Sequence, residues 1–189
     1  FPIIARKLLN RWQQERVFRG YRKPASFDTN IIVIGAGAAG LVTAYIAAAS
    51  KARVMLIERD AMGGDCLNTG CVPSKALIRS ARLLHDMQHA HSFGIKHSGI
   101  VTADFAAVMK RVAQVIADVE PHDSIERYTR LGVDCLRGSA TITSPWTVEV
   151  DGKNYSARSI VIATGGKPFV PPITGLADCG YVTSDTLWK

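Results

Sequence analysis

The sequence contains no apolar run that approaches the roughly 18 residues of a membrane-spanning helix, so no span is expected within it. It contains no internal repeat and no low-complexity tract, which excludes a repeat array. Only four cysteines are present and no secretory signal precedes them, so a disulfide-stapled secreted fold is not expected. With 189 residues, 47% of them hydrophobic, the chain is large enough for one globular domain and an appendage.

Acidic residues are scarce at the start of the chain. Residues 1–26 hold seven of the 23 Lys and Arg residues but one of the 16 Asp and Glu residues. The net charge of +7 therefore belongs mostly to this segment, and the rest of the chain is nearly neutral. Because the basic charge is local, no nucleic-acid partner is expected for the main body.

Residues 1–29 are interpreted as a basic amphipathic arm and linker. Phe1, Ile4, Leu8 and Trp12 fall at helical spacing, with basic residues between them. Such a helix can pack on a neighbouring surface, lie on an anionic membrane or contact nucleic acid, and the residues leave all three open. Because the chain does not begin with Met, we expect it to be a piece of a longer protein.

A strand–turn–helix–strand unit opens the main body, residues 30–189. The run "IIVI" at 31–34 indicates a buried strand, and three glycines in G-x-G-x-x-G spacing follow it. After an Ala-rich helix, a second strand at 52–58 ends at Glu58, whose carboxylate can accept hydrogen bonds from ribose hydroxyls. The unit predicts a Rossmann-like α/β domain with a central parallel sheet and a dinucleotide site.

Each glycine of this turn has a physical reason to be there. Gly35 permits the tight turn, Gly37 lets the backbone approach a pyrophosphate, and Gly40 lets helix and strand pack closely. The start of the helix, at Ala38 and Ala39, then offers free N–H groups and a positive dipole end to the phosphates.

The rest of the main body is expected to contain helices and strands in succession. Helices are predicted at about 73–90, 102–117 and 121–131, and strands at 135–143, 146–150 and 155–166. Because "DGKN" joins the last two strands, they are expected to pair as an antiparallel hairpin within a β-meander.

Two cysteines stand close together in "GGDCLNTGCVPSK", at Cys66 and Cys71. A regular helix would separate their Cα atoms by about 7.5 Å, beyond the roughly 4.4–6.8 Å of a bridged pair, so a bridge requires the irregular turn that "LNTG" can supply. Pro73 suits a first helical turn, which places Cys71 at a helix N-terminus where the dipole favours a thiolate. The spacing of the two cysteines and the placing of Cys71 favour a redox-active pair over a purely structural disulfide. A zinc site is less favoured because no second pair has ligand spacing, and no metal site is predicted.

The segment 30–189 resembles the class I pyridine nucleotide-disulfide oxidoreductases, and its thiol motif matches that family's redox-active signature almost position for position. The resemblance implies FAD in the glycine site, Cys66 as the thiol that meets the substrate and Cys71 as the thiol that faces the flavin. It also places Lys75 near the flavin. Further residues that it assigns to FAD are Gly64, Asp65, Ala140, Ala163, Thr164 and Gly165, beside the glycine turn and Glu58.

The resemblance also implies partners and further domains. Full-length members are homodimers that take electrons from NAD(P)H, and a partner subunit donates a His–Glu acid–base pair. Their substrates are small-molecule disulfides, such as dihydrolipoamide or a glutathione-like disulfide, or the metal ion Hg(II). These features imply a cytoplasmic enzyme of cell redox homeostasis. The domains for NAD(P)H and dimerisation are expected outside this chain.

The arm, in "ARKLLNRWQQER", is similar to the junction in membrane-associated mercuric-reductase-like members, which places it on the cytoplasmic face of a membrane. Two alternatives to a disulfide oxidoreductase stay open. One is a flavoprotein oxidase or quinone reductase with idle cysteines, and the other is a non-catalytic, membrane-tethered FAD-binding piece.

Overall fold

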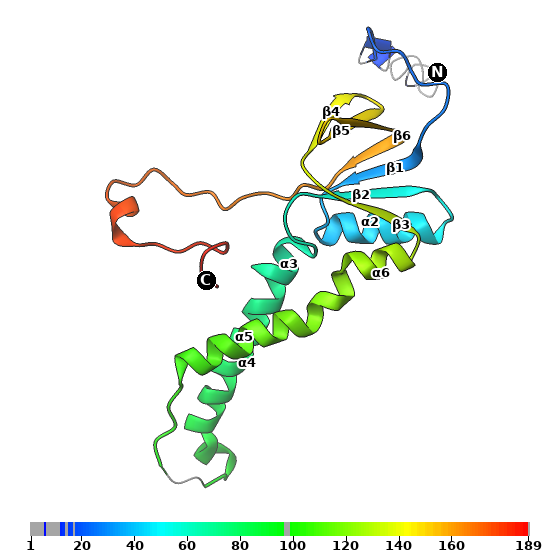
Figure 1. The fold of residues 1–189 in the computed structure, drawn as a ribbon. Coiled ribbons are helices and arrows are strands. Elements are labelled where there is room, and N and C mark those ends of the chain that lie inside the picture. Colours follow the sequence, from blue (N-terminus) through cyan, green and yellow to red (C-terminus); the bar gives the residue numbers. More distant parts are fainter. Residues whose placement is uncertain (1–5, 7–11, 14, 17, 97–98, 189) are drawn as a thin grey trace.

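The computed structural model describes residues 6, 12, 13, 15, 16, 18–96 and 99–188, and shows a sheet covered by helices, with a long helical hairpin projecting from it (Figure 1). Most of the arm therefore lies outside the described residues, including Phe1, Ile4 and Leu8. Among the described residues, no helix combines the length and the apolar character needed to cross a membrane.

The sheet has six strands in the order β3-β2-β1-β6-β5-β4. Their bounds are β1 Thr29–Ile34, β2 Val54–Glu58, β3 Val133–Arg137, β4 Ala140–Ser144, β5 Thr147–Val150 and β6 Lys153–Ile162. Strands β3, β2, β1 and β6 pair in parallel, whereas β4, β5 and the first part of β6 pair antiparallel. The long strand β6 thus joins the parallel sheet to the meander, and the fold is the Rossmann-like α/β fold that the sequence predicts.

The turn between β5 and β6 confirms the predicted hairpin. Asp151 and Gly152 have φ angles of 50° and 77°, the left-handed values that a tight two-residue hairpin requires. The strand expected at 135–143 is instead two strands, because the chain leaves the parallel sheet at Gly138, whose φ is 159°. An added Cβ on Gly138 would lie 2.5 Å from Val150 Cγ1, so the chain can change direction there only without a side chain.

The helices follow the predicted order with shifted ends. Their bounds are α2 Ala38–Ala49, α3 Gly64–Asn68, α4 Cys71–Gln88, α5 Phe105–Val119 and α6 Ile125–Arg130, with short 3-10 helices at Ala90–Phe93, Glu120–Asp123 and Leu176–Cys179. The helix expected at 121–131 is divided, because Ser124 stops the first part and caps α6 by accepting from Arg127 N at 3.2 Å. Helix α3 has no counterpart in the sequence predictions.

Apolar side chains cover both faces of the parallel strands. Alternate residues of β1 point to opposite sides, so that Val33 packs with Leu41 and Ala44 of α2, while Ile32 packs with Val148 of the meander. All of these side chains are buried. The continuous apolar runs of β1 and β2 therefore reflect strands covered on both faces, and the turns after them are held at one end of a rigid sheet.

Candidate functional site

The glycine turn after β1 is built by close backbone contacts. Gly35 has a φ of 101°, and its N–H donates to the Ile57 carbonyl at 2.8 Å. A Cβ on Gly35 would lie 2.3 Å from the Ala163 carbonyl oxygen, and a Cβ on Gly40 would lie 1.8 Å from the Gly35 carbonyl oxygen. At both positions the neighbouring backbone therefore leaves no room for a side chain, whether or not a ligand is bound.

Gly37 is different. It is the N-cap of α2 with a φ of −77°, and an added Cβ would meet nothing nearer than Gly64 Cα, at 3.8 Å. The fold itself would accept a methyl group here, so the reason for a glycine lies on the open side of the turn. Ala38 and Ala39 follow as exposed residues of the first turn of α2, where backbone N–H groups have no partner within the helix. This cradle fits the pyrophosphate of a dinucleotide.

The thiol motif is joined directly to the glycine turn. Gly63 has a φ of 85° and donates its N–H to the Ala36 carbonyl at 2.9 Å. The next residue, Gly64, has a φ of 53°, and a Cβ on it would lie 2.6 Å from Gly37 Cα. Two successive glycines therefore let α3, which carries Cys66, start against the turn that would hold the pyrophosphate.

The two thiols lie on either side of a helix break. Cys66 is half-buried in α3, and Cys71 is the exposed first residue of α4, as expected from Pro73. Both are free thiols in the structure. A hydrogen bond with Cys71, followed by burial, raises the pKa of the Cys66 thiol above its ordinary value. Lys75 is exposed four residues after Cys71, which is one helical turn and therefore the same face of α4.

Contacts that the sequence did not indicate hold the break between α3 and α4. The Asn68 amide donates to the carbonyls of Met62 at 3.0 Å and Gly64 at 2.9 Å, which fixes α3 from both ends. The Trp188 indole N–H donates to the Thr69 carbonyl at 2.8 Å, from 119 residues away. The segment between the cysteines is thus held by the distant end of the chain.

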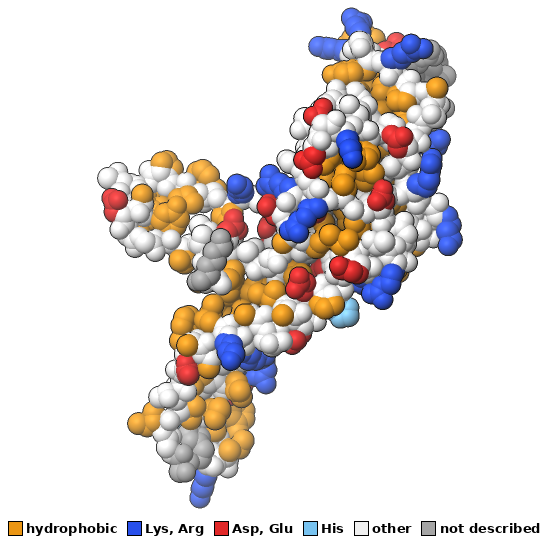
Figure 2. Space-filling model, in the orientation of Figure 1, with side chains coloured by type: hydrophobic (Ala, Val, Ile, Leu, Met, Phe, Trp, Pro, Cys, Tyr) orange, Lys and Arg blue, Asp and Glu red, His pale blue; other side chains and the backbone are white. Residues whose placement is uncertain are grey.

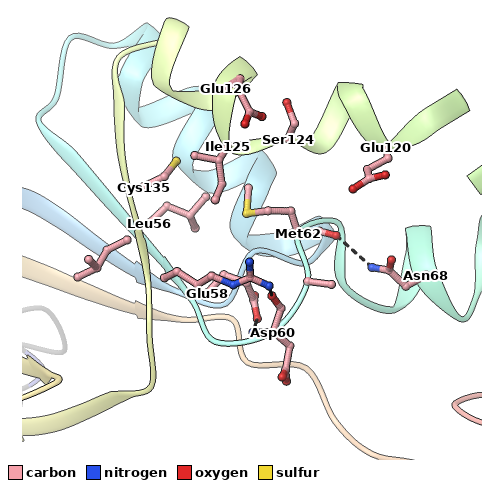
Figure 3. A pocket seen from close by; sticks show the side chains of 13 residues that line it. Leu56, Glu58, Asp60, Met62, Asn68, Glu120, Ser124, Ile125, Glu126 and Cys135 are labelled. Carbon is pink, nitrogen blue, oxygen red and sulfur yellow. Dashed lines mark hydrogen bonds between the residues drawn. The ribbon is translucent and has the colours of Figure 1, made fainter. Parts of the chain in front are cut away.

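Glu58 lies at the carboxyl end of β2, and its carboxylate is held by backbone N–H groups. Oε2 accepts from Ala36 N at 2.6 Å and Oε1 accepts from Asp60 N at 2.8 Å, so each oxygen keeps capacity for a further donor such as a ribose hydroxyl. Glu58 also lines a cavity of about 230 Å³ between the ends of β2 and β3 and the start of α6 (Figure 3). Cys135 and Asn68 face the same cavity.

The other residues that the family resemblance assigns to FAD binding lie at three places in the structure. Asp65 is exposed in α3, next to Gly64. The half-buried Ala163 donates its N–H to the Ile34 carbonyl at 2.8 Å, which brings the exposed Thr164 and Gly165 out beside the glycine turn. Ala140 begins β4 two residues after Gly138, whose N–H donates to the Glu58 carbonyl at 2.9 Å.

Similar proteins include several oxidoreductases. The chain is 38% identical to the dihydrolipoyl dehydrogenase of Chlamydia pneumoniae over 84% of its own length and 34% of that protein. It is 32% identical to the mercuric reductase of Bacillus cereus over 86% of its own length and 26% of that protein. The chain thus spans about a third or less of these relatives.

A solved structure matches the fold as well. The Cu(II) complex of the HOCl-induced flavoprotein disulfide reductase RclA from Escherichia coli superposes with a TM-score of 0.65 at 27% identity, covering 84% of this chain and 33% of that one. The family model for pyridine nucleotide-disulphide oxidoreductases matches residues 29–188, which include the glycine turn, the thiol motif and the meander. The chain belongs to the pyridine nucleotide-disulphide oxidoreductase family.

Proposed function

We propose that the whole protein is an FAD-dependent NAD(P)H oxidoreductase whose Cys66–Cys71 pair passes electrons to a small-molecule disulfide or to Hg(II). One observation carries the proposal: the helix that bears Cys66 starts against the glycine turn, through the bond from Gly63 N to the Ala36 carbonyl at 2.9 Å. The thiols and the dinucleotide cradle are therefore parts of one rigid unit.

When bound, FAD supplies two electrons that it has taken from NAD(P)H. We propose that Gly37, Ala38 and Ala39 bind its pyrophosphate and that Glu58 orients its ribose. Asp65, Lys75, Ala140, Thr164 and Gly165 line the remainder of the same site. The cradle fits the group because Gly37 alone of the three turn glycines is open on its outer side.

The dithiol then reduces a substrate disulfide in two exchanges. The Cys66 sulfur attacks one substrate sulfur, forming a mixed disulfide and releasing the other half of the substrate as a thiol. The Cys71 sulfur attacks Cys66, which restores the Cys66–Cys71 disulfide and releases the second half as a thiol. Two electrons and two protons leave the protein in each cycle.

The raised pKa of Cys66 means that this thiol must lose its proton to a base before it attacks. We propose that a His–Glu pair of a partner subunit acts as this base in a full-length homodimer. We further propose a cytoplasmic location, with the basic arm against the inner face of the membrane. The charge of residues 1–26 supports the arm's part of this proposal.

Anaerobic titration of the full-length protein tests the proposed function. Reduction should take up about four electrons per FAD, two for the flavin and two for the disulfide, and Cys66→Ser should lower this to about two. Cys135→Ser removes a thiol of β3 outside the motif and should leave the count at four. A count of two in the unaltered protein would show idle cysteines and refute the proposal.

A further inference from the structure

A second cavity, of about 610 Å³, lies at the opposite end of the sheet from the glycine turn. Its lining comes from the segment before β1, the start of β1, the residue before β2 and β6. It consists of Lys23, Pro24, Ala25, Ser26, Phe27, Thr29, Asn30, Arg53 and Arg158. We call it the basic cavity. The amino ends of β1 and β2 border it, whereas the carboxyl ends of these strands border the glycine turn. The remainder of β1, residues 31–34, spans about 13 Å of strand between the two sites.

The lining carries three positive charges and no acidic side chain. Among the described residues, the ion pairs within 4.0 Å involve Arg59, Arg82 and His85, and none involves a cation of this cavity. Arg53 Nη2 donates to the Phe27 carbonyl at 3.2 Å, which holds this guanidinium at the cavity. Its other N–H groups, together with the cationic groups of Lys23 and Arg158, can bind an external anion.

Asp28, the acidic residue between the lining residues Phe27 and Thr29 in the sequence, has hydrogen-bond partners of its own. The Asp28 carboxylate accepts from both the backbone N–H and the hydroxyl of Ser156, at 2.8 Å and 2.7 Å. These bonds lower the pKa of Asp28, and Arg53 adds a smaller electrostatic contribution. Asp28 therefore keeps its own partners on β6 and is absent from the lining of the basic cavity.

Two further polar side chains in the lining present donors. The Asn30 side-chain oxygen accepts from Arg53 N at 2.8 Å, which orients the amide so that its NH₂ group remains available. The Ser26 hydroxyl can donate as well. Guanidinium groups bind phosphate oxygens in pairs of parallel hydrogen bonds, and amide and hydroxyl donors can complete the shell of such an anion.

We propose that the basic cavity binds a phosphate group that belongs to a larger molecule, at a site separate from the flavin. The volume exceeds what a bare phosphate needs and is typical of sites for small organic ligands. The same chemistry is offered by a phospholipid headgroup and by a free phosphate ester, and Lys23 places the cavity at the root of the basic arm.

The test uses full-length, flavin-bound protein, so that phosphate cannot occupy the flavin site. Calorimetric titration with inorganic phosphate at low ionic strength should show binding that Arg158→Gln weakens roughly tenfold, because the substitution removes charged donors to the phosphate oxygens. Lys153→Gln is the matched control, since it removes the same charge from the same strand outside the lining and should leave the affinity unchanged.

Co-sedimentation with vesicles of equal parts phosphatidylglycerol and phosphatidylcholine distinguishes the source of the phosphate. If Arg158→Gln weakens both phosphate and vesicle binding, the ligand is a lipid headgroup, and if it weakens phosphate binding alone, the ligand is a free ester. Two results would overturn the proposal: no phosphate binding by the unaltered protein, or equal losses in Arg158→Gln and Lys153→Gln. Neither result bears on the electron count that tests the proposed function.

Discussion

The three glycines of the turn after β1 are glycines for different reasons: the fold requires two of them, and a bound cofactor would require the third. Gly35 and Gly40 are required by the backbone itself, because a Cβ on either would overlap a carbonyl oxygen. Gly37 has no such neighbour, and its φ of −77° is open to any residue. The three glycines form one motif in the sequence. In the structure, Gly35 and Gly40 are constrained by neighbouring backbone, whereas Gly37 is not.

A pair of matched substitutions tests this distinction. Gly37→Ala should leave the fold and its thermal stability nearly unchanged and should weaken FAD binding at least about tenfold, or 1.4 kcal/mol, because the methyl group occupies the approach to the turn. Gly40→Ala adds the same methyl group but should destabilise the protein by about 1–3 kcal/mol or more. The measurements are bound flavin per chain and the free energy of unfolding. A yellow, flavin-replete Gly37→Ala protein would contradict the assignment.

The two cysteines should differ in their pH dependence. In reduced, flavin-free protein, the alkylation rate of Cys66 should reach half its maximum at a pH above that of an ordinary thiol, because its hydrogen bond with Cys71 and its burial raise its pKa. Cys71→Ala removes the largest cause, so the midpoint should move to lower pH. Rates measured by mass spectrometry from pH 6 to 11 would test this, and an unchanged or higher midpoint would show that Cys71 is not the cause.

Among the helices and strands, the sequence predicts those that a short local pattern of residue types determines. Short patterns of residue type predict several elements of the structure: strands β1 and β2, the turn after Ile34 and the start of α4 beside Pro73. Helix α3 was missed because five residues are too few to show a helical period. The division of 135–143 at Gly138 was missed because a single glycine within a strand pattern can also mark a bulge in a continuous strand.

Two contacts that shape the site join distant residues and could not be predicted from local pattern. The bond from the Trp188 indole to the Thr69 carbonyl joins residues 119 positions apart, and nothing near either residue indicates it. The same holds for the contact of Gly64 with Gly37, which depends on how α3 enters the turn. The sequence therefore indicated both halves of the site, and the structure shows how they meet.

The arm is the element whose role depends on a surface outside the described chain. At its root the Phe18 ring stacks on Trp146 of the meander, with ring centroids 5.1 Å apart, while Trp12 is 57% exposed. Each basic residue near an anionic membrane contributes about 1 kcal/mol, and salt screens this attraction over roughly 10 Å at 0.1 M.

We therefore expect the full-length protein to bind anionic vesicles at low salt, and to bind them less as salt rises. Deletion of residues 1–26 should abolish the binding. Trp12 fluorescence should shift to the blue as the indole leaves water. If the intact protein does not bind such vesicles at low salt, the arm is a linker or a packing helix, and its assignment to the membrane is wrong.

The whole molecule has two chemically different ends joined by one sheet. The carboxyl ends of the parallel strands carry the glycine turn, Glu58 and the thiol motif, and the amino ends carry the basic cavity and the arm. Figure 2 shows Lys and Arg side chains around the end that bears the arm, and apolar side chains along the helical hairpin of α4 and α5. Redox chemistry is thus proposed for one end of the sheet and anion binding for the other.

The central claim is that Cys66 and Cys71 receive electrons from the flavin. Differential alkylation of the oxidised, flavin-bound, full-length protein, before and after anaerobic addition of NADH or NADPH, tests it most directly. Peptides that contain Cys66 and Cys71 should be unlabelled before reduction and both labelled after it, while the labelling of Cys135 should not change. If the two cysteines are alkylated equally before and after the flavin is reduced, they are not a redox pair and the account is wrong.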